Sequence, residues 1–220
     1  MKKNLVLFVL FVLPIVAYLF FASGINSFSK LPTVTAKVPD FPASWKALDG
    51  KPVSLDKKIT VLGFGGKKVL ENRGNIFNLN QKIYQRYHEF KDLQFVTICP
   101  EGTQQDVQEI VKAIGAISDT RHWSFVFAKE DEINAYFQTL KLKGKLNDDS
   151  GTDHVYIIDK ERNLRGRKDP KEYKEGYSTF HPSELSNEML DDFKIILYEY
   201  RAALKKNNSY LKNQKRNVEE

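Results

Sequence analysis

The residues of this chain that could carry redox or metal chemistry are few and widely separated. Its 220 residues include one cysteine, Cys99, and four histidines, His88, His122, His154 and His181. A single cysteine cannot form an internal disulfide, and it has no second thiol for disulfide exchange. The histidines show no ligand spacing such as His-x-x-x-His, so their spacing alone predicts no metal site.

A glycine-rich turn is the second place where chemistry is expected. An apolar run over 58–64 ends in Gly65, Gly66, Lys67 and Lys68, just before a helical pattern. Backbone N–H groups after two glycines, with two lysines beside them, form a candidate anion-binding site for a carboxylate or phosphate. The alternative is a solvated basic turn. The fingerprint G-x-x-x-x-G-K-[ST] of phosphate loops is not met.

The apolar pattern predicts elements that alternate between strand and helix. The expected strands and helices lie at 58–64, 74–90, 93–99, 123–127, 130–140 and 184–205. A further helix is expected to open at Thr103, with 107, 110, 111 and 114 on its inward face. Hairpins are expected over 45–54, around Asp49-Gly50, and between 154–158 and 163–167. Three parallel strands linked by helical crossovers and closed by an antiparallel hairpin make a thioredoxin-like, three-layer α/β/α domain with an N-terminal hairpin.

The N-terminal segment predicts attachment to a membrane. Lys2 and Lys3 precede an uncharged apolar run over 5–22. As a helix rising about 1.5 Å per residue, this run covers most of a ~30 Å hydrocarbon core. We predict an uncleaved signal anchor, while the small residues 22–24 leave cleavage as a signal peptide open. The positive-inside rule then places the N-terminus in the cytoplasm and the C-terminal domain in the periplasm, as a single-pass inner-membrane protein.

Composition predicts the remaining divisions and the kinds of partner. The expected parts are a transmembrane helix at 1–23, a linker at 24–40, the thioredoxin-like domain at 41–205 and a charged flexible tail at 206–220. Much of the formal net charge of +6 lies in this tail, which is typical of a solvated chain end. We therefore expect the membrane and a membrane or periplasmic protein as partners, and no nucleic acid.

The chain resembles the Sco/SenC family of membrane-anchored, thioredoxin-fold proteins. The residues that carry the resemblance are the N-terminal apolar segment, 47–54, 61–64, and Asp153-His154 followed by 156–159. The resemblance implies assistance in copper delivery to the CuA site of cytochrome c oxidase. It also implies a Gly-Phe-Thr-x-Cys-x-x-x-Cys turn whose two thiolates bind copper together with a distant histidine.

This chain departs from the family pattern at two of the three copper ligands. The corresponding turn begins at Gly63-Phe64, so the cysteine positions fall at or near Lys67 and Glu71, and His154 fits the histidine position. Copper(I) selects soft sulfur ligands, which an ammonium group and a carboxylate do not replace. We expect no cofactor, with His154 as a weak metal candidate and copper bound only through a ligand set foreign to the family.

Two functions remain open. In the first, the chain is a non-catalytic interaction module with a degenerate active site, acting in cytochrome c oxidase assembly or envelope homeostasis. In the second, it is an unconventional thioredoxin-like oxidoreductase or peroxidase that uses Cys99 or His154. A reactive cysteine needs exposure and a lowered pKa. A buried Cys99 far from the 65–71 turn would therefore count against the second function.

Overall fold

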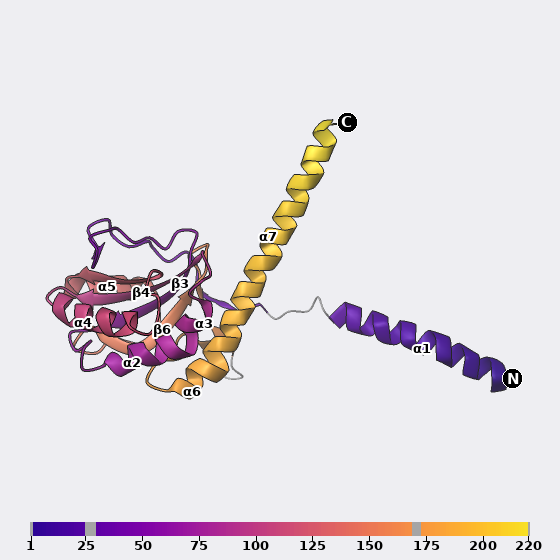
Figure 1. The fold of residues 1–220 in the computed structure, drawn as a ribbon, viewed down its shortest axis with the longest axis horizontal. Coiled ribbons are helices and arrows are strands. Elements are labelled where there is room, and N and C mark those ends of the chain that lie inside the picture. The colour runs from indigo at the N-terminus through magenta and orange to yellow at the C-terminus, as the bar shows by residue number, and fades with distance from the viewer. Residues whose placement is uncertain (1, 25–29, 169–172, 220) are drawn as a thin grey trace. The chain divides into compact units, whose positions relative to one another are not determined.

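A computed structural model describes residues 2–24, 30–168 and 173–219 (Figure 1). The chain forms two compact units, residues 1–30 and 31–220. The strands are β1 (Thr33–Thr35), β2 (Lys46–Ala47), β3 (Ile59–Gly65), β4 (Leu93–Pro100), β5 (Trp123–Ala128), β6 (Gly151–Ile158), β7 (Leu164–Arg165), β8 (Arg167–Lys168), β9 (Tyr173–Lys174) and β10 (Tyr177–Ser178). The helices are α1 (Lys2–Gly24), α2 (Arg73–Leu79), α3 (Gln85–Tyr87), α4 (Gln104–Gly115), α5 (Glu130–Thr139), α6 (Pro182–Glu184) and α7 (Leu190–Glu219), with π-helical turns η1 (Asn80–Tyr84) and η2 (Leu185–Met189).

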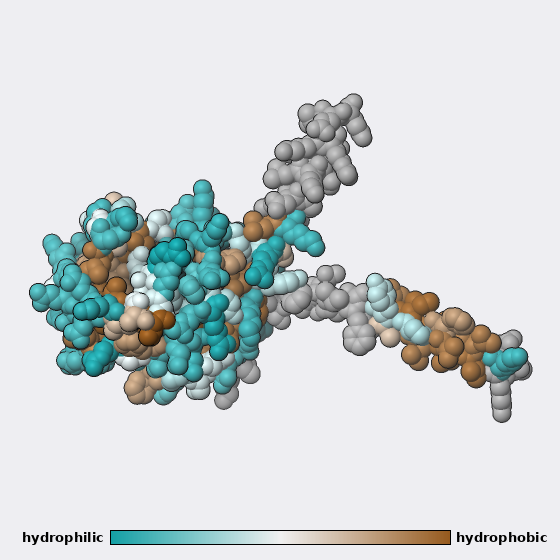
Figure 2. All heavy atoms as spheres, viewed as in Figure 1, coloured by the Kyte–Doolittle hydropathy of each residue, from teal (hydrophilic) through white to brown (hydrophobic). Residues whose placement is uncertain are grey.

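The first unit contains helix α1, which forms where an apolar helix was predicted. Large hydrophobic side chains, including Val6, Phe8, Phe11 and Leu19, are exposed along it (Figure 2). Among the residues that the structure describes, no helix is long and apolar enough to cross a membrane, in contrast to the transmembrane helix predicted at 1–23.

The second unit is built on a mixed sheet. Its strands lie in the order β1-β7-β6-β3-β4-β5-β2, and β10 also pairs with β6. Strands β3, β4 and β5 run parallel, whereas β6 runs antiparallel to β3 and forms a hairpin with β7. The prediction of three parallel strands closed by an antiparallel hairpin is thus confirmed. β3 and β4 are almost wholly buried, because helices cover both faces of the sheet.

The sheet divides the core into two hydrophobic clusters, because successive side chains of a strand point to opposite faces. On one face, Val61 and Phe95 pack with side chains of α2, α4 and α7. On the other face, Leu62 and Phe64 pack with α5 and with the 38–55 segment. The helices therefore lie in two layers with the sheet between them, as Figure 1 shows, which is the predicted three-layer arrangement.

The N-terminal hairpin predicted over 45–54 is wrong. A turn does form at Asp49-Gly50, where Gly50 has φ 78° and Asp49 Oδ1 accepts the N–H of Lys51 (3.1 Å). The second arm does not become a strand, since Pro52 has no N–H to donate to a ladder. Strand β2 instead pairs with β5 at the edge of the main sheet.

The folded domain begins earlier than predicted. Leu31 and Val38 are buried within it, and the short strand β1 between them pairs with β7. The two apolar residues and the strand pairing make this segment part of the core. The linker predicted over 24–40 is therefore wrong from residue 31 onward, and its residues 25–29 lie outside the described residues.

A buried arginine links residues 31–38, the first segment of the folded domain, to the last helix. Arg165 is 8% exposed, and its guanidinium donates to the carbonyl oxygen of Leu31 (Nε, 3.1 Å) and to Asp159 Oδ2 (Nη1, 3.0 Å). Its Nη2 donates to Glu199 Oε2 (3.0 Å) on α7. Glu199 in turn accepts the N–H of Leu31 (3.1 Å). This Arg165 cluster joins the start of the domain, the β6–β7 turn and α7.

The last helix is longer than the predicted 184–205. It is formed by α6, η2 and α7 in succession, and α7 continues to Glu219. The residues predicted to form a flexible tail, 206–220, are thus helical as far as 219. They include lysine, arginine, leucine, glutamine and glutamate, which favour helix, beside several asparagines. The prediction of a flexible tail rested on the charge of this segment and did not take its helix propensity into account.

Candidate functional site

The turn after β3 is held closely against the start of β6. Gly66 has φ 69°, a left-handed conformation that favours glycine. A Cβ placed on it would lie 2.8 Å from Asp149 Oδ2 and 2.9 Å from the Cα of Gly151. The N–H of Lys67 donates to the carbonyl oxygen of Asp149 (2.9 Å). Gly66 is therefore required both by its backbone conformation and by the close approach of the 149–151 segment.

The two positions that the resemblance assigns to copper-binding cysteines lie at the surface. Lys67 is exposed, and its Nζ forms an ion pair with Glu130 Oε1 (2.8 Å). Glu71 is also exposed. Among the described residues there is no group of three or more histidine, cysteine, aspartate or glutamate side chains placed to hold a metal ion.

The candidate anion site on Gly65, Gly66, Lys67 and Lys68 has acidic surroundings. The backbone N–H of Lys67 already has an acceptor, and its ammonium group already pairs with a carboxylate. The carboxylate of Asp149 lies beside Gly66 and would repel an anion bound at that point. These contacts therefore stabilise the turn and do not favour phosphate binding. The side chain of Lys68 is exposed.

Cys99 lies beneath this turn but is inaccessible. A Cβ on Gly65 would lie 2.9 Å from the Cys99 Sγ, so the thiol is adjacent to the turn rather than far from it. Its side chain is fully buried in the hydrophobic cluster shared with α2 and α4. Burial raises the pKa of Cys99 to about 12, although a hydrogen bond from the Gly65 N–H acts in the opposite direction. Such a thiol is a poor nucleophile at neutral pH.

We predict that Cys99 does not react with an aromatic disulfide reagent at pH 7.5 while the chain is folded. The physical reasons are its burial and the small fraction of thiolate that its raised pKa allows. The measurement is the absorbance of the released thiolate. In guanidinium chloride the same sample should release one equivalent. Rapid reaction of one equivalent without denaturant would contradict the buried position.

His154 lies in β6, opposite Ser178 of β10. Its Nδ1 lies 2.8 Å from Asp153 Oδ1, and its side chain is 45% exposed. Ser178 Oγ donates to the other carboxylate oxygen of Asp153 (2.8 Å). Partial burial acts to raise the pKa of Asp153, but the hydrogen bond from Ser178 and the neighbouring His154 outweigh it, so that the pKa lies below its ordinary value.

The other histidines are engaged elsewhere. His88 stacks on Tyr84, with ring centroids 5.7 Å apart, and His181 packs edge-on against Phe180. Burial lowers the pKa of His122 from its ordinary value. No pair of histidines is brought together at a metal-binding cluster within the described residues.

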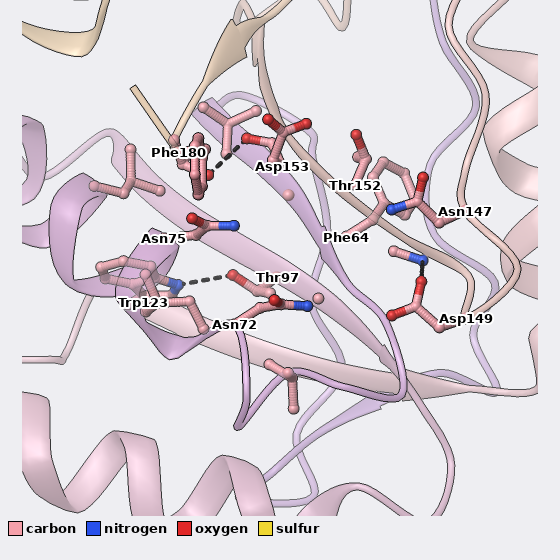
Figure 3. Close-up of a pocket in the computed structure, with 18 residues that line it drawn as sticks. Phe64, Asn72, Asn75, Thr97, Trp123, Asn147, Asp149, Thr152, Asp153 and Phe180 are labelled. Atoms are coloured by element: carbon pink, nitrogen blue, oxygen red, sulfur yellow. Dashed lines mark hydrogen bonds between the residues drawn. The ribbon is translucent and has the colours of Figure 1, made fainter. Parts of the chain in front are cut away.

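A pocket of about 200 Å³ lies beside the turn, between α2 and the β6–β10 edge of the sheet (Figure 3). Asn72 and Asn75 line it from the start of α2, Thr97 and Trp123 from β4 and β5, and Phe180 from the segment after β10. Asp153 and Val155 also line it, whereas His154 does not. Trp123 Nε1 donates to Thr97 Oγ1 (3.0 Å) at its base.

Sequence reasoning did not identify this pocket. One signal was present, because Asn72 and Asn75 are three residues apart and residues at this spacing share a face of a helix. Nothing in the sequence placed them opposite Thr97 or Phe180. Gly63 and Gly65 of β3 indicate a turn in the sequence, but the sequence does not show that their lack of side chains leaves space for a pocket.

Comparison with known proteins identifies the fold. No protein-family model matches the sequence, and no curated protein matches it. In structure the chain is similar to BsSco, a member of the Sco family of cytochrome c oxidase assembly proteins, with 13% identity and a TM-score of 0.53 over 76% of this chain and 97% of that one. It is also similar to a proposed protein disulfide isomerase from Bacteroides thetaiotaomicron, with 15% identity and a TM-score of 0.50 over 80% of this chain and 99% of that one. These likenesses show a thioredoxin-like α/β fold and confirm the Sco resemblance at the level of the fold.

Proposed function

We propose that this chain is a redox-inactive interaction module of the thioredoxin-like fold, which works outside the cytoplasm in the assembly of a respiratory complex. The observation that carries the proposal is the chemistry of the turn after β3. Exposed Lys67 and Glu71 stand where the resemblance places two copper-binding cysteines, and the single thiol of the sequence, Cys99, is buried. Neither Cu(I) chelation by two thiolates nor disulfide exchange is available to this residue set.

The proposed role in assembly is taken from the structural neighbour. BsSco is described as belonging to a family of cytochrome c oxidase assembly proteins. A shared fold does not carry a function with it, so this role is a proposal for the present chain. It accords with a domain that has the thioredoxin-like fold and presents the charged side chains of Lys67 and Glu71 at the turn after β3. A role in envelope homeostasis is compatible with the same features.

Helix α1 supports the proposed location. Lys2 and Lys3 precede its apolar residues, which is the pattern of an export signal whether or not the segment is later removed. The positive-inside rule would then place the domain that begins at Leu31 outside the cytoplasm. A membrane or periplasmic protein is the proposed partner. Co-purification of this chain with oxidase assembly factors from native membranes would support this proposal.

Titration with Cu(I), in competition with a chromophoric chelator, tests the proposal. We expect the full-length chain to leave the copper with the chelator, and the Cys99→Ser variant to give the same curve, because a sequence with a single cysteine has no pair of thiolates. In parallel, the chain should not accelerate the reduction of insulin disulfides by dithiothreitol. Stoichiometric Cu(I) binding that disappears in His154→Ala would contradict the proposal, as would insulin reduction that depends on Cys99.

The enzymatic alternative is less favoured for a specific reason. A peroxidase or oxidoreductase that used Cys99 would require its thiolate, and burial raises the pKa of this thiol. Peroxide consumption that is equal in the parent chain and in Cys99→Ser would remove this residue from consideration. Loss of consumption in His154→Ala alone would revive the alternative.

A further inference from the structure

The pocket beside α2 has an electrostatic character that limits its ligands. None of its lining residues is lysine, arginine or histidine, whereas Asp149 and Asp153 are among them. An anionic ligand would therefore meet two carboxylates and no cationic side chain in the lining. The pocket excludes the phosphate or carboxylate that the neighbouring glycine turn was considered to bind.

The two carboxylates are already engaged within the protein. Asp153 accepts from Ser178 Oγ (2.8 Å) through one oxygen and contacts His154 Nδ1 (2.8 Å) through the other. Asp149 Oδ1 accepts the N–H of Gly151 (3.2 Å). In Figure 3 both carboxyl groups lie at the margin of the pocket, away from its middle. These contacts leave the charge of the two carboxylates in place but use part of their capacity to accept hydrogen bonds from a ligand.

The groups in the middle of the pocket both donate and accept hydrogen bonds. The side-chain amides of Asn72 and Asn75 form no hydrogen bond with any residue that the structure describes, and Figure 3 shows them directed inward. Thr97 is 7% exposed, and its hydroxyl accepts from Trp123 while its own proton has no acceptor among those residues. A buried hydroxyl with an unused donor is costly unless a ligand or water accepts from it.

The walls of the pocket favour a flat and small group. Gly63 and Gly65 form part of the lining, and a Cβ on Gly65 would lie 2.9 Å from the Cγ2 of Val69, so the absence of a side chain keeps the floor open. Trp123 closes the base, and Phe180, which is 66% exposed, stands at the rim. A volume of about 200 Å³ is below the ~300–1,000 Å³ of sites for drug-sized ligands.

We propose that this pocket binds a neutral carboxamide group. A carboxamide is planar, and it offers an acceptor to Thr97 and both a donor and an acceptor to Asn72 and Asn75. The group could come from a glutamine or asparagine side chain of a partner polypeptide or from a free small amide. The inference deepens the proposed function, since it names what an interaction module would recognise, and it does not depend on the absence of copper chemistry.

The two tryptophans allow a direct test with the full-length, ¹⁵N-labelled chain. The indole N–H of Trp123 lies in the pocket, whereas that of Trp45 donates to Glu132 (3.1 Å) from the other hydrophobic cluster. We expect N-acetylglutamine N-methylamide to shift the Trp123 indole signal in a saturable manner and to leave the Trp45 signal in place. The glutamate and norvaline analogues, which share the blocked backbone, should cause no saturable shift.

Matched variants connect the shift to the pocket. Asn72→Ala/Asn75→Ala should weaken binding of the glutamine probe by about tenfold or more, as expected from the loss of several hydrogen bonds. Asn187→Ala is the control, because Asn187 is an exposed asparagine outside the pocket. An unchanged Trp45 signal in all variants establishes that they are folded.

The outcomes distinguish a free amide from a polypeptide side chain as the source of the carboxamide. They also distinguish failure of the carboxamide site from failure of the proposed function. Propionamide that binds as tightly as the glutamine probe indicates a free small amide, and binding of the glutamine probe alone indicates a polypeptide side chain. An unshifted Trp123 signal, an equal shift with the glutamate analogue, or equal binding by the double variant overturns the carboxamide site. Each of these results leaves the outcome of the copper and insulin experiments unaffected.

Discussion

Replacing Arg165 with methionine should lower the free energy of unfolding by about 3–5 kcal/mol, the cost of removing one partner from a buried ion-pair cluster. The substitution leaves the carboxylates of Asp159 and Glu199 in a poorly solvated site without their cation. It also removes the donors to the carbonyl oxygen of Leu31. Urea unfolding followed by circular dichroism measures the change.

An exposed arginine provides the matched control. Arg121 pairs with Asp119 (2.6 Å), but its side chain is 81% exposed. Surface ion pairs contribute little, so Arg121→Met should leave the unfolding midpoint nearly unchanged. If the two substitutions destabilise the chain equally, the Arg165 cluster does not hold the domain together as described.

A Gly66→Ala substitution should destabilise the domain by about 2–5 kcal/mol, through two costs that add. The left-handed conformation at φ 69° costs an alanine about 1–2 kcal/mol. The new methyl group would also meet the Cα of Gly151 at 2.9 Å, and overpacking of this kind costs about 1–3 kcal/mol. The neighbouring backbone cannot yield as a flexible side chain would. Thermal unfolding of parent and variant gives the difference.

Gly50→Ala separates these two costs. Gly50 has φ 78°, but a Cβ placed on it would have nothing within 4 Å. Its substitution should therefore show the conformational cost alone, about 1–2 kcal/mol. Equal effects at the two glycines would show that the 149–151 segment moves aside. The close packing of this segment against the turn after β3 would then not contribute to stability, contrary to our prediction.

The central fold was predictable because its signals are local and repeated. Buried strands such as β3 and β4 appear in the sequence as short continuous apolar runs, and α4 and α5 carry one apolar face each. Edge elements were less predictable. The Asp49-Gly50 pair correctly indicates a turn, yet the pairing of β2 with β5 depends on a contact with residues about eighty positions away. Strand β1 has only three residues, too few for a pattern.

For the candidate site, the sequence predicted which ligands are missing but not which residues form the pocket. The sequence alone shows that Lys67 and Glu71 cannot supply sulfur ligands and that a single cysteine lacks a partner. The burial of Cys99 follows from its place at the end of an apolar strand. Sequence patterns could not predict the pocket, since it is assembled from α2, the four strands β3, β4, β5 and β6, and the segment after β10. Its defining feature is hydrogen-bonding capacity left unused, which is visible only when the surroundings of each group are known.

The link between Leu31 and Glu199 bears on the order in which the domain can be completed. Leu31 leaves the ribosome, and any export channel, well before Glu199, because synthesis and translocation proceed from the N-terminus. The N–H of Leu31 therefore remains without its final acceptor until α7 has been delivered. Chains interrupted before residue 199 would keep the pairing of β1 with β7 but would lack the Glu199 carboxylate that bonds both Leu31 and Arg165.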